Sequence, residues 1–135
     1  MIYVIGIGPG SKELMTMQCI DAIKDAEVIV GYKTYINLIT DLIEGKEIVQ
    51  NGMRQEIDRC REAVEIAKTG KKVAVISSGD AGIYGMAGLI LELTAKEEQN
   101  IDVKVVPGVT ASIGAAAILG APIMHDFCHI SLSDL

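Results

Sequence analysis

Three short turns rich in glycine carry the residue types best suited to binding a small molecule. The turn at residues 78–88 contains four glycines and one carboxylate, Asp80, and it directly follows the apolar run 73–76. Two more glycine turns, at residues 6–10 and 107–110, follow apolar runs in the same way. Glycine permits positive φ and lets a ligand approach main-chain N–H and C=O groups closely. We therefore predict a site built from backbone groups and one carboxylate.

The apolar runs alternate with amphipathic stretches, which predicts a repeating order of strands and helices. We expect strands at 2–5, 28–30, 47–49, 73–76 and 103–106. We expect helices at 16–26, 34–43, 54–68, 82–94 and 110–119. The spacing of apolar residues places two sets of side chains on buried helix faces: Met17, Ile20 and Ile23, and then Ile57, Cys60, Val64 and Ala67. The charged residues of the helix at 54–68, among them Arg59, are expected on its solvated face.

Strands separated by helices are parallel, because each crossover returns the chain to the same edge of the sheet. The expected fold is therefore α/β, a five-stranded and mostly parallel sheet flanked by helices. All three glycine turns fall at the carboxyl edge, where open α/β sheets bind ligands. No linker or repeat divides the sequence, so we expect one domain.

The composition favours small-molecule chemistry. Half of the 135 residues are hydrophobic and the formal net charge is −6, which argues against binding nucleic acid or an anionic membrane. No apolar segment approaches the roughly 18 to 20 residues that span a bilayer, and no signal peptide is visible at the start. We predict a cytoplasmic protein.

The three cysteines, Cys19, Cys60 and Cys128, are widely spaced and predict free thiols rather than disulfides or a zinc site. His125 and His129 flank Cys128, but the alternation of apolar residues there favours a strand or irregular segment, which would scatter metal ligands. We expect no bound metal.

The glycine turn at 6–10 does not fit two common nucleotide motifs. A dinucleotide fingerprint needs a third glycine where Ser11 stands, and an acidic residue at the end of the second strand, which Val30-Gly31-Tyr32 lacks. The P-loop pattern is also absent. The ligand is therefore not held by its phosphates. An adenosine that carries a positive sulfonium, S-adenosylmethionine, suits backbone carbonyls and one carboxylate.

The turns at residues 6–10, 77–84 and 107–111 resemble the amino-terminal domain of the tetrapyrrole methylases, and the resemblance extends over essentially the whole chain. Segments 30–35, 52–57 and 125–135 resemble the branch that methylates C-17 of a corrinoid. The resemblance implies methyl transfer from S-adenosylmethionine to C-17 of precorrin-3B or cobalt-precorrin-3, with ring contraction, in cobalamin biosynthesis. The metal-free and cobalt-bearing substrates both remain open.

The resemblance also implies site residues. Those expected to bind the cofactor are Pro9, Gly79, Asp80, Ile83, Thr110 and Ala111. Thr110 and Asp80 are also suited to capping helices, from Ala111 and from near Gly82 respectively. Tyr32, Arg54 and His125 are expected to contact the substrate. For Arg54 the reason is that guanidinium pairs well with the carboxylates of a corrinoid. No catalytic base is assigned; Tyr32, Tyr35, His125 and Asp126 are the candidates.

The family that this sequence resembles consists of homodimeric enzymes whose subunits have two domains, with the cofactor in the cleft between the domains. The resemblance therefore implies that residues 1–135 are the amino-terminal domain, that the second domain is absent from this sequence, and that the piece alone is inactive. An alternative is a cofactor-free α/β binding or regulatory domain, in which the glycine turns are only tight connections.

Overall fold

The structure is a computed structural model that describes residues 1–52, 54–121 and 123–132. Its centre is a five-stranded sheet in the order β3-β2-β4-β1-β5, and every neighbouring pair is parallel. The strands are β1 (Ile2–Gly6), β2 (Val28–Tyr32), β3 (Glu47–Asn51), β4 (Val73–Ser77) and β5 (Val103–Val106). The expected fold class is confirmed, and each strand begins at the residue predicted for it.

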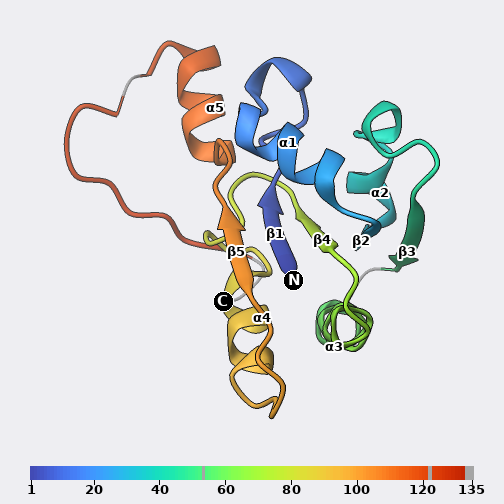
Figure 1. The fold of residues 1–135 in the computed structure, drawn as a ribbon. Coiled ribbons are helices and arrows are strands. Elements are labelled where there is room, and N and C mark those ends of the chain that lie inside the picture. Colours follow the sequence, from blue (N-terminus) through green and yellow to red (C-terminus); the bar gives the residue numbers. More distant parts are fainter. Residues whose placement is uncertain (53, 122, 133–135) are drawn as a thin grey trace.

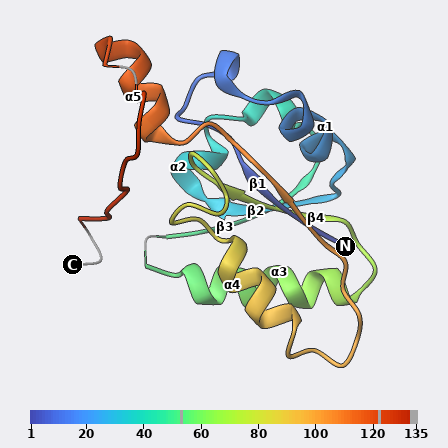
Figure 2. The ribbon, with the colours of Figure 1, turned by 90° about the vertical axis from the view of Figure 1, so that its left-hand side faces the viewer.

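Helices cover both faces of the sheet and form a three-layer structure (Figure 1). One face packs against α1 (Met17–Asp25) and α2 (Lys33–Ile36), and the other against α3 (Glu56–Lys68) and α4 (Ala87–Thr94). Figure 2 shows α3 and α4 side by side beneath the sheet, with α5 (Ala111–Leu119) at the opposite end of the molecule. Short 3₁₀ turns at Lys12–Leu14 and Thr40–Leu42 complete the elements.

The aliphatic strands fill two cores, because successive side chains point to opposite faces of the sheet. In β1, Tyr3 and Ile5 join the core beneath α1 and α2, whereas Ile2 and Val4 join the core beneath α3 and α4. Both faces of the central strands are buried, so their sequences read as continuous apolar runs rather than as an alternating pattern. This is why the strands could be located from sequence.

The helix predicted at 34–43 is wrong in its length. The chain forms the short α2 and then the 3₁₀ turn at Thr40–Leu42. The buried side chains Ile36, Ile39 and Ile43 still reach the core. Their β-branched types favour a continuous helix only weakly, so tertiary contacts decide the backbone.

The helix predicted at 82–94 begins only at Ala87. The Ser77 hydroxyl accepts a hydrogen bond from the Met86 N–H at 3.2 Å, and the Ala81 carbonyl accepts one from the Ala87 N–H at 3.0 Å. These bonds keep residues 82–86 in an irregular loop, where two glycines already disfavour a helix. No helix therefore begins near Gly82 for Asp80 to cap.

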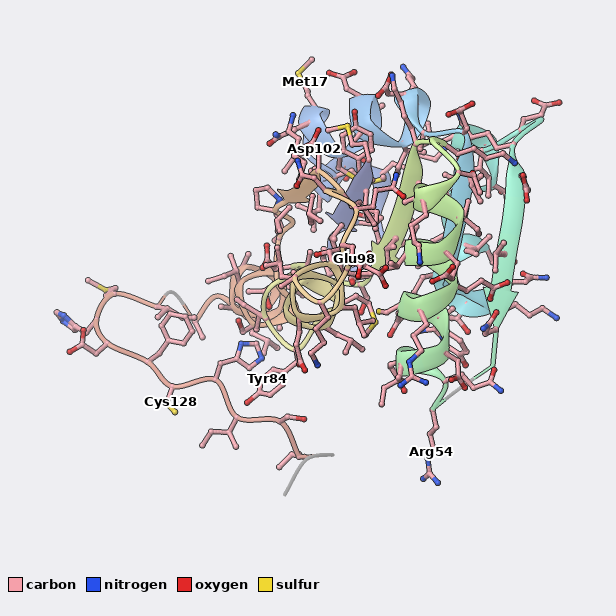
Figure 3. The ribbon with its side chains drawn as sticks, turned by 60° about the horizontal axis from the view of Figure 1, so that its bottom comes forward. Met17, Arg54, Tyr84, Glu98, Asp102 and Cys128 are labelled. Carbon is pink, nitrogen blue, oxygen red and sulfur yellow. The ribbon has the colours of Figure 1, made fainter. Side chains whose placement is uncertain are left out.

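Three side chains on helices lie where the sequence pattern did not place them. Met17 is 81% exposed and projects outward from the start of α1 (Figure 3). Ile57 is 53% exposed in the first turn of α3, because the buried stripe of that helix passes through Arg59, Cys60, Ala63, Val64 and Ala67. Arg59, expected to be solvated, is only 4% exposed.

The cysteines are free thiols: Cys19 and Cys60 are buried and Cys128 is exposed. Burial raises the pKa of both Cys19 and Cys60 to about 11, so these two thiols stay protonated at neutral pH. Within the described ranges, no helix is long and apolar enough to cross a bilayer.

We predict that burial, not residue type, decides the effect of truncating isoleucine in the sheet. Ile29 in β2 pairs in register with Ile48 in β3, yet the first is fully buried and the second is 42% exposed. Ile29→Ala should lower the free energy of unfolding by about 2–5 kcal/mol. Ile48→Ala, the matched control, should lower it by much less in the same urea titration. Equal losses would contradict the assigned burial.

Tyr3, Asp25 and Lys72 form a hydrogen-bonded polar cluster at the amino end of the sheet. The Asp25 carboxylate accepts hydrogen bonds from the Tyr3 hydroxyl and from Lys72 Nζ, the latter at 2.8 Å. The Lys72 hydrogen bond, followed by that of Tyr3, lowers the pKa of Asp25 below its ordinary value of 3.8. The Asp25 hydrogen bond correspondingly raises the pKa of Tyr3.

We predict that Asp25→Asn reduces stability in a pH-dependent way. Because folding lowers the pKa of Asp25, its ionised form contributes stability above its ordinary pKa of 3.8, and this contribution is lost as the pH falls through the folded value. The variant should be less stable than the parent near pH 6, and the difference should shrink below about pH 4. Asp21→Asn, an exposed change on the same helix, is the control. A difference independent of pH, followed by urea unfolding, would contradict this role.

Candidate functional site

The three glycine turns meet at the carboxyl edge of the sheet, as the topology predicts. They follow β1, β4 and β5, which are neighbours in the strand order. Gly8 and Gly79 join the first two turns by exchanging hydrogen bonds, with N···O distances of 3.0 and 2.8 Å. Segments about 70 residues apart in sequence therefore form one surface.

Asp80 fastens the second turn and connects it to the third. One carboxylate oxygen accepts a hydrogen bond from the Gly82 N–H at 2.8 Å, and the other accepts one from the Gly108 N–H at 2.9 Å. Hydrogen bonds to an ionised acceptor are stronger than those between neutral groups. The carboxylate therefore holds the shape of the site, and each oxygen keeps lone-pair capacity for a further donor.

Glycine is required where the turns touch. A Cβ atom on Gly108 would lie 2.2 Å from the Gly79 carbonyl oxygen and 2.5 Å from that of Gly6. A Cβ on Gly6 would likewise lie 2.6 Å from the Gly79 oxygen. The neighbouring atoms are backbone oxygens rather than flexible side chains, so the three turns can approach this closely only where the residues lack Cβ atoms.

The structure gathers the residues predicted to bind a cofactor around these turns. Gly79 has a φ of 60°, and a Cβ built on it would face the Cα of Thr110 at 3.6 Å. Thr110 occupies the N-cap position of α5, before Ala111, but its hydroxyl makes no capping hydrogen bond. Pro9 packs against Gly114 of α5. Ile83 lies on the loop that carries Asp80, and its side chain is 42% exposed.

The chemistry of this cluster fits an adenosine that carries a sulfonium better than it fits a phosphorylated nucleotide. Residues 6–10, 78–85 and 107–111 include no lysine or arginine. They offer main-chain N–H and C=O groups, the unused Thr110 hydroxyl and one carboxylate. Such groups can bind a purine, ribose hydroxyls and a positive charge. A phosphate group would find no lysine or arginine within these turns.

A pocket of about 710 Å³ adjoins the glycine turns, on the β2 side of β4. Its lining comes from the ends of β2 and β4, from α2, from the loop after β4, from the start of α3 and the residue Arg54 before it, and from the segment after α5: Tyr32, Tyr35, Arg54, Glu56, Arg59, Ile76, Ser77, Ser78, Tyr84, Gly85, Met86 and Ser131. The rings of Tyr32 and Tyr35 meet edge to face, with centroids 5.3 Å apart. The volume suits a sizeable organic molecule.

Two residues of the pocket wall, Arg54 and Tyr84, have positive φ angles of 61° and 52°. Such angles are uncommon for residues other than glycine and gather at ligand sites. Tyr84 is held by the segment after α5, because its hydroxyl donates to the His129 carbonyl at 3.2 Å and accepts from the Ser131 N–H at 3.1 Å. The side chain reaches this segment in Figure 3.

The residues predicted to contact a substrate are placed unequally. Tyr32 and Arg54 both line the pocket, with the Arg54 side chain extending outward into solvent (Figure 3). His125 and Asp126 are exposed on the segment 123–132 and are not part of the lining. In the described part of the chain, no three side chains of the metal-binding types gather as a metal site.

Sequence reasoning missed two features of the pocket. Arg59 was assigned to the solvated face of its helix, and only the fold shows that it is buried in the pocket wall. The anchoring role of Tyr84 depends on partners 45 and 47 residues away in the sequence. A tyrosine within a turn rich in glycine was the one available signal for the second feature.

We predict that Gly108→Ala disrupts the cluster whereas Gly88→Ala does not. The first change places a methyl group against two carbonyl oxygens and should cost about 1–3 kcal/mol of unfolding free energy. Gly88 lies in α4 with open space around a built Cβ, so alanine should stabilise the protein by up to about 1 kcal/mol. Chemical denaturation measures both. A Gly108→Ala protein as stable as the parent would show that the turns can separate at no cost.

The chain matches the family model of the tetrapyrrole (corrin/porphyrin) methylases over residues 1–135. It is 58% identical over 135 residues to a probable cobalt-factor III C(17)-methyltransferase of Salmonella typhimurium, and the match covers 100% of this chain and 56% of that protein. The chain thus spans about half the length of the curated relative.

Solved structures agree with the sequence match. The crystal structure of the methyltransferase CobJ superposes with a TM-score of 0.90 at 41% identity, over 98% of this chain and 56% of that one. Uroporphyrin-III C-methyl transferase from Thermus thermophilus, complexed with S-adenyl homocysteine, has a TM-score of 0.70 at 25% identity, over 85% of this chain and 47% of that one. From its motifs, its fold and these matches, the chain belongs to the tetrapyrrole methylase family.

Proposed function

We propose that this chain binds S-adenosylmethionine for methyl transfer to C-17 of a corrinoid precursor, precorrin-3B or cobalt-precorrin-3, with ring contraction, in cobalamin biosynthesis. The observation that carries the proposal is the convergence of three cation-free glycine turns beside a pocket of about 710 Å³. The 58% identity to a probable cobalt-factor III C(17)-methyltransferase supports the choice of substrate.

The turns supply the cofactor site in this proposal. Gly79, Thr110 and Ala111 provide main-chain groups and one free hydroxyl, and Asp80 holds the turns while offering its remaining lone pairs. Pro9 and Ile83 bound the site from the first turn and from the loop after β4. When bound, the cofactor supplies an already activated methyl group, so the protein has chiefly to align donor and acceptor.

The pocket supplies the substrate site. The loop after β4 borders both places: Gly79 and Asp80 belong to the turns, whereas Tyr84, Gly85 and Met86 line the pocket. Tyr32 and Arg54 contact the macrocycle from the pocket wall in this scheme, and His125 is a proposed contact from outside the pocket lining. Tyr32 and Tyr35 are the candidate bases that already line the pocket.

We further propose that residues 1–135 form the amino-terminal domain of a two-domain protein that works as a homodimer in the cytoplasm, and that this domain alone is inactive. A run of exposed apolar side chains supports this view: Ile118, Leu119, Met124, Phe127, Ile130 and Leu132. Apolar surface of this extent generally marks an interface. A second domain or subunit would cover it and complete the site.

We predict that Thr110→Val weakens cofactor binding without loss of folding. The Thr110 hydroxyl makes no capping bond in the structure, so its removal should leave the melting temperature nearly unchanged. Loss of one hydrogen bond to the ligand should lower the affinity for S-adenosylhomocysteine roughly three- to tenfold. Isothermal titration of the full-length natural protein measures this change. Thr34→Val, an exposed threonine on α2, is the matched control.

The same titration tests the function itself. Binding by the parent, weakened by Thr110→Val and unaffected by Thr34→Val, supports the methyltransferase. Absence of binding to the folded full-length parent would overturn the proposal and favour a cofactor-free binding or regulatory domain. Asp80→Ala is less diagnostic, because it also frees the Gly82 and Gly108 amides and should destabilise the turns.

A further inference from the structure

Arg59 is a buried cation whose charge the described residues compensate only in part. Its residue is only 4% exposed, although it lies on α3 among charged neighbours that face solvent. Burying a charge is costly unless the charge is paired and hydrogen-bonded. A buried arginine therefore needs either a carboxylate partner within the protein or another reason for its position.

The described residues provide only part of that compensation. Arg59 Nη2 donates to the Gly52 carbonyl oxygen at 3.0 Å, and the guanidinium carbon lies 6.0 Å from the centre of the Tyr32 ring. Within the described ranges, Nε–H has no hydrogen-bond partner and no carboxylate forms an ion pair with the guanidinium. Five N–H donors and one carbonyl acceptor leave most of the binding capacity unused.

The unused capacity lies in the wall of the pocket. Arg59 lines it together with Tyr32, Tyr35, Ser77 and Ser78. Glu56 also belongs to the wall, but it is exposed and forms no ion pair with Arg59. A guanidinium beside aromatic rings and hydroxyls is suited to a carboxylate attached to a large, partly apolar molecule.

We propose that Arg59 binds a carboxylate side chain of the tetrapyrrole substrate and thereby helps to select the acidic, non-amidated macrocycle. This inference rests on the proposed function, and it assigns a specificity to one residue of the pocket. The ligand carboxylate supplies a negative charge that no carboxylate of the described residues provides by an ion pair with Arg59.

Burial distinguishes Arg59 from Arg54, the arginine that sequence reasoning selected. Arg54 is exposed at the mouth of the pocket, where water and salt screen its charge. Arg59 is held by the Gly52 carbonyl beside Tyr32, away from bulk water. Charge pairing is stronger in such surroundings, so Arg59 is the better discriminator between a carboxylate and an amide.

The experiment compares two corrinoids that differ in charge but share a macrocycle. Dicyanocobyrinic acid presents carboxylates, and its heptaamide presents neutral amides. Their affinities for the full-length natural protein are measured by absorbance titration for the parent, Arg59→Gln, Arg59→Lys and the control Arg61→Gln, which changes an exposed arginine on the same helix. S-adenosylhomocysteine titration and thermal melting are recorded for each protein.

We predict that Arg59→Gln lowers the affinity for the acid roughly tenfold to hundredfold, as expected for lost charge-assisted hydrogen bonds. The affinity for the heptaamide and for S-adenosylhomocysteine should stay within about threefold of the parent. Arg59→Lys should regain part of the preference for the acid, because it keeps the charge but not the planar fork. Arg61→Gln should match the parent.

Three outcomes would overturn the proposal. Equal loss of both corrinoids, or loss of S-adenosylhomocysteine binding together with a lower melting temperature, would make Arg59 a purely structural residue. An unchanged preference for the acid in Arg59→Gln would place carboxylate recognition elsewhere. Failure of the proposed function is separate, since it appears as absence of S-adenosylhomocysteine binding in the parent protein.

Discussion

The close approach of three main-chain segments at the carboxyl edge of the sheet is the constraint on which the rest of the structure depends. Gly6 and Gly108 allow the approach because neither carries a Cβ atom, and Asp80 secures it with one hydrogen bond from each of two turns. The parallel topology brings the strand ends together, but the contacts between turns fix their separation. The surface offered to a ligand is therefore mostly backbone, and its shape depends on these few residues.

The carboxyl edge is divided into two chemically different regions by the loop after β4. On one side, the ends of β1 and β5 present glycine turns free of cationic side chains. On the other side, the end of β2, α2, and the start of α3 with the residues just before it contribute tyrosines and arginines to a pocket. In the proposed function, a donor molecule with a positive centre and an acceptor molecule with acidic side chains would meet across this loop. The two sides of the loop therefore favour ligands of opposite charge.

Much of the fold was predictable because the central strands are buried on both faces and therefore read as apolar runs. The meeting of the turns followed from topology alone. Amphipathic spacing predicted the wrong burial for Arg59 and Ile57. A charged residue such as Arg59 is usually exposed, and only the fold shows that this one is buried. The short α2 and the late start of α4 depend on the contacts of Ile39 and on the Ser77 hydroxyl, which no local pattern contains. The Tyr84 contacts join distant segments and were equally hidden.

The two hydrogen bonds of the Tyr84 hydroxyl make the segment after α5 and the loop after β4 mechanically interdependent. Tyr84 and Asp80 stand four positions apart on one loop, while the partners of Tyr84 are His129 and Ser131. Residues 129–131 cannot swing away from the pocket without either breaking both bonds or pulling on the loop that Asp80 clamps to Gly108. A displacement of residues 129–131 would therefore also displace the loop after β4, unless both hydrogen bonds broke. Tyr84, which joins the two segments, has a positive φ angle, a strained backbone conformation for a residue other than glycine.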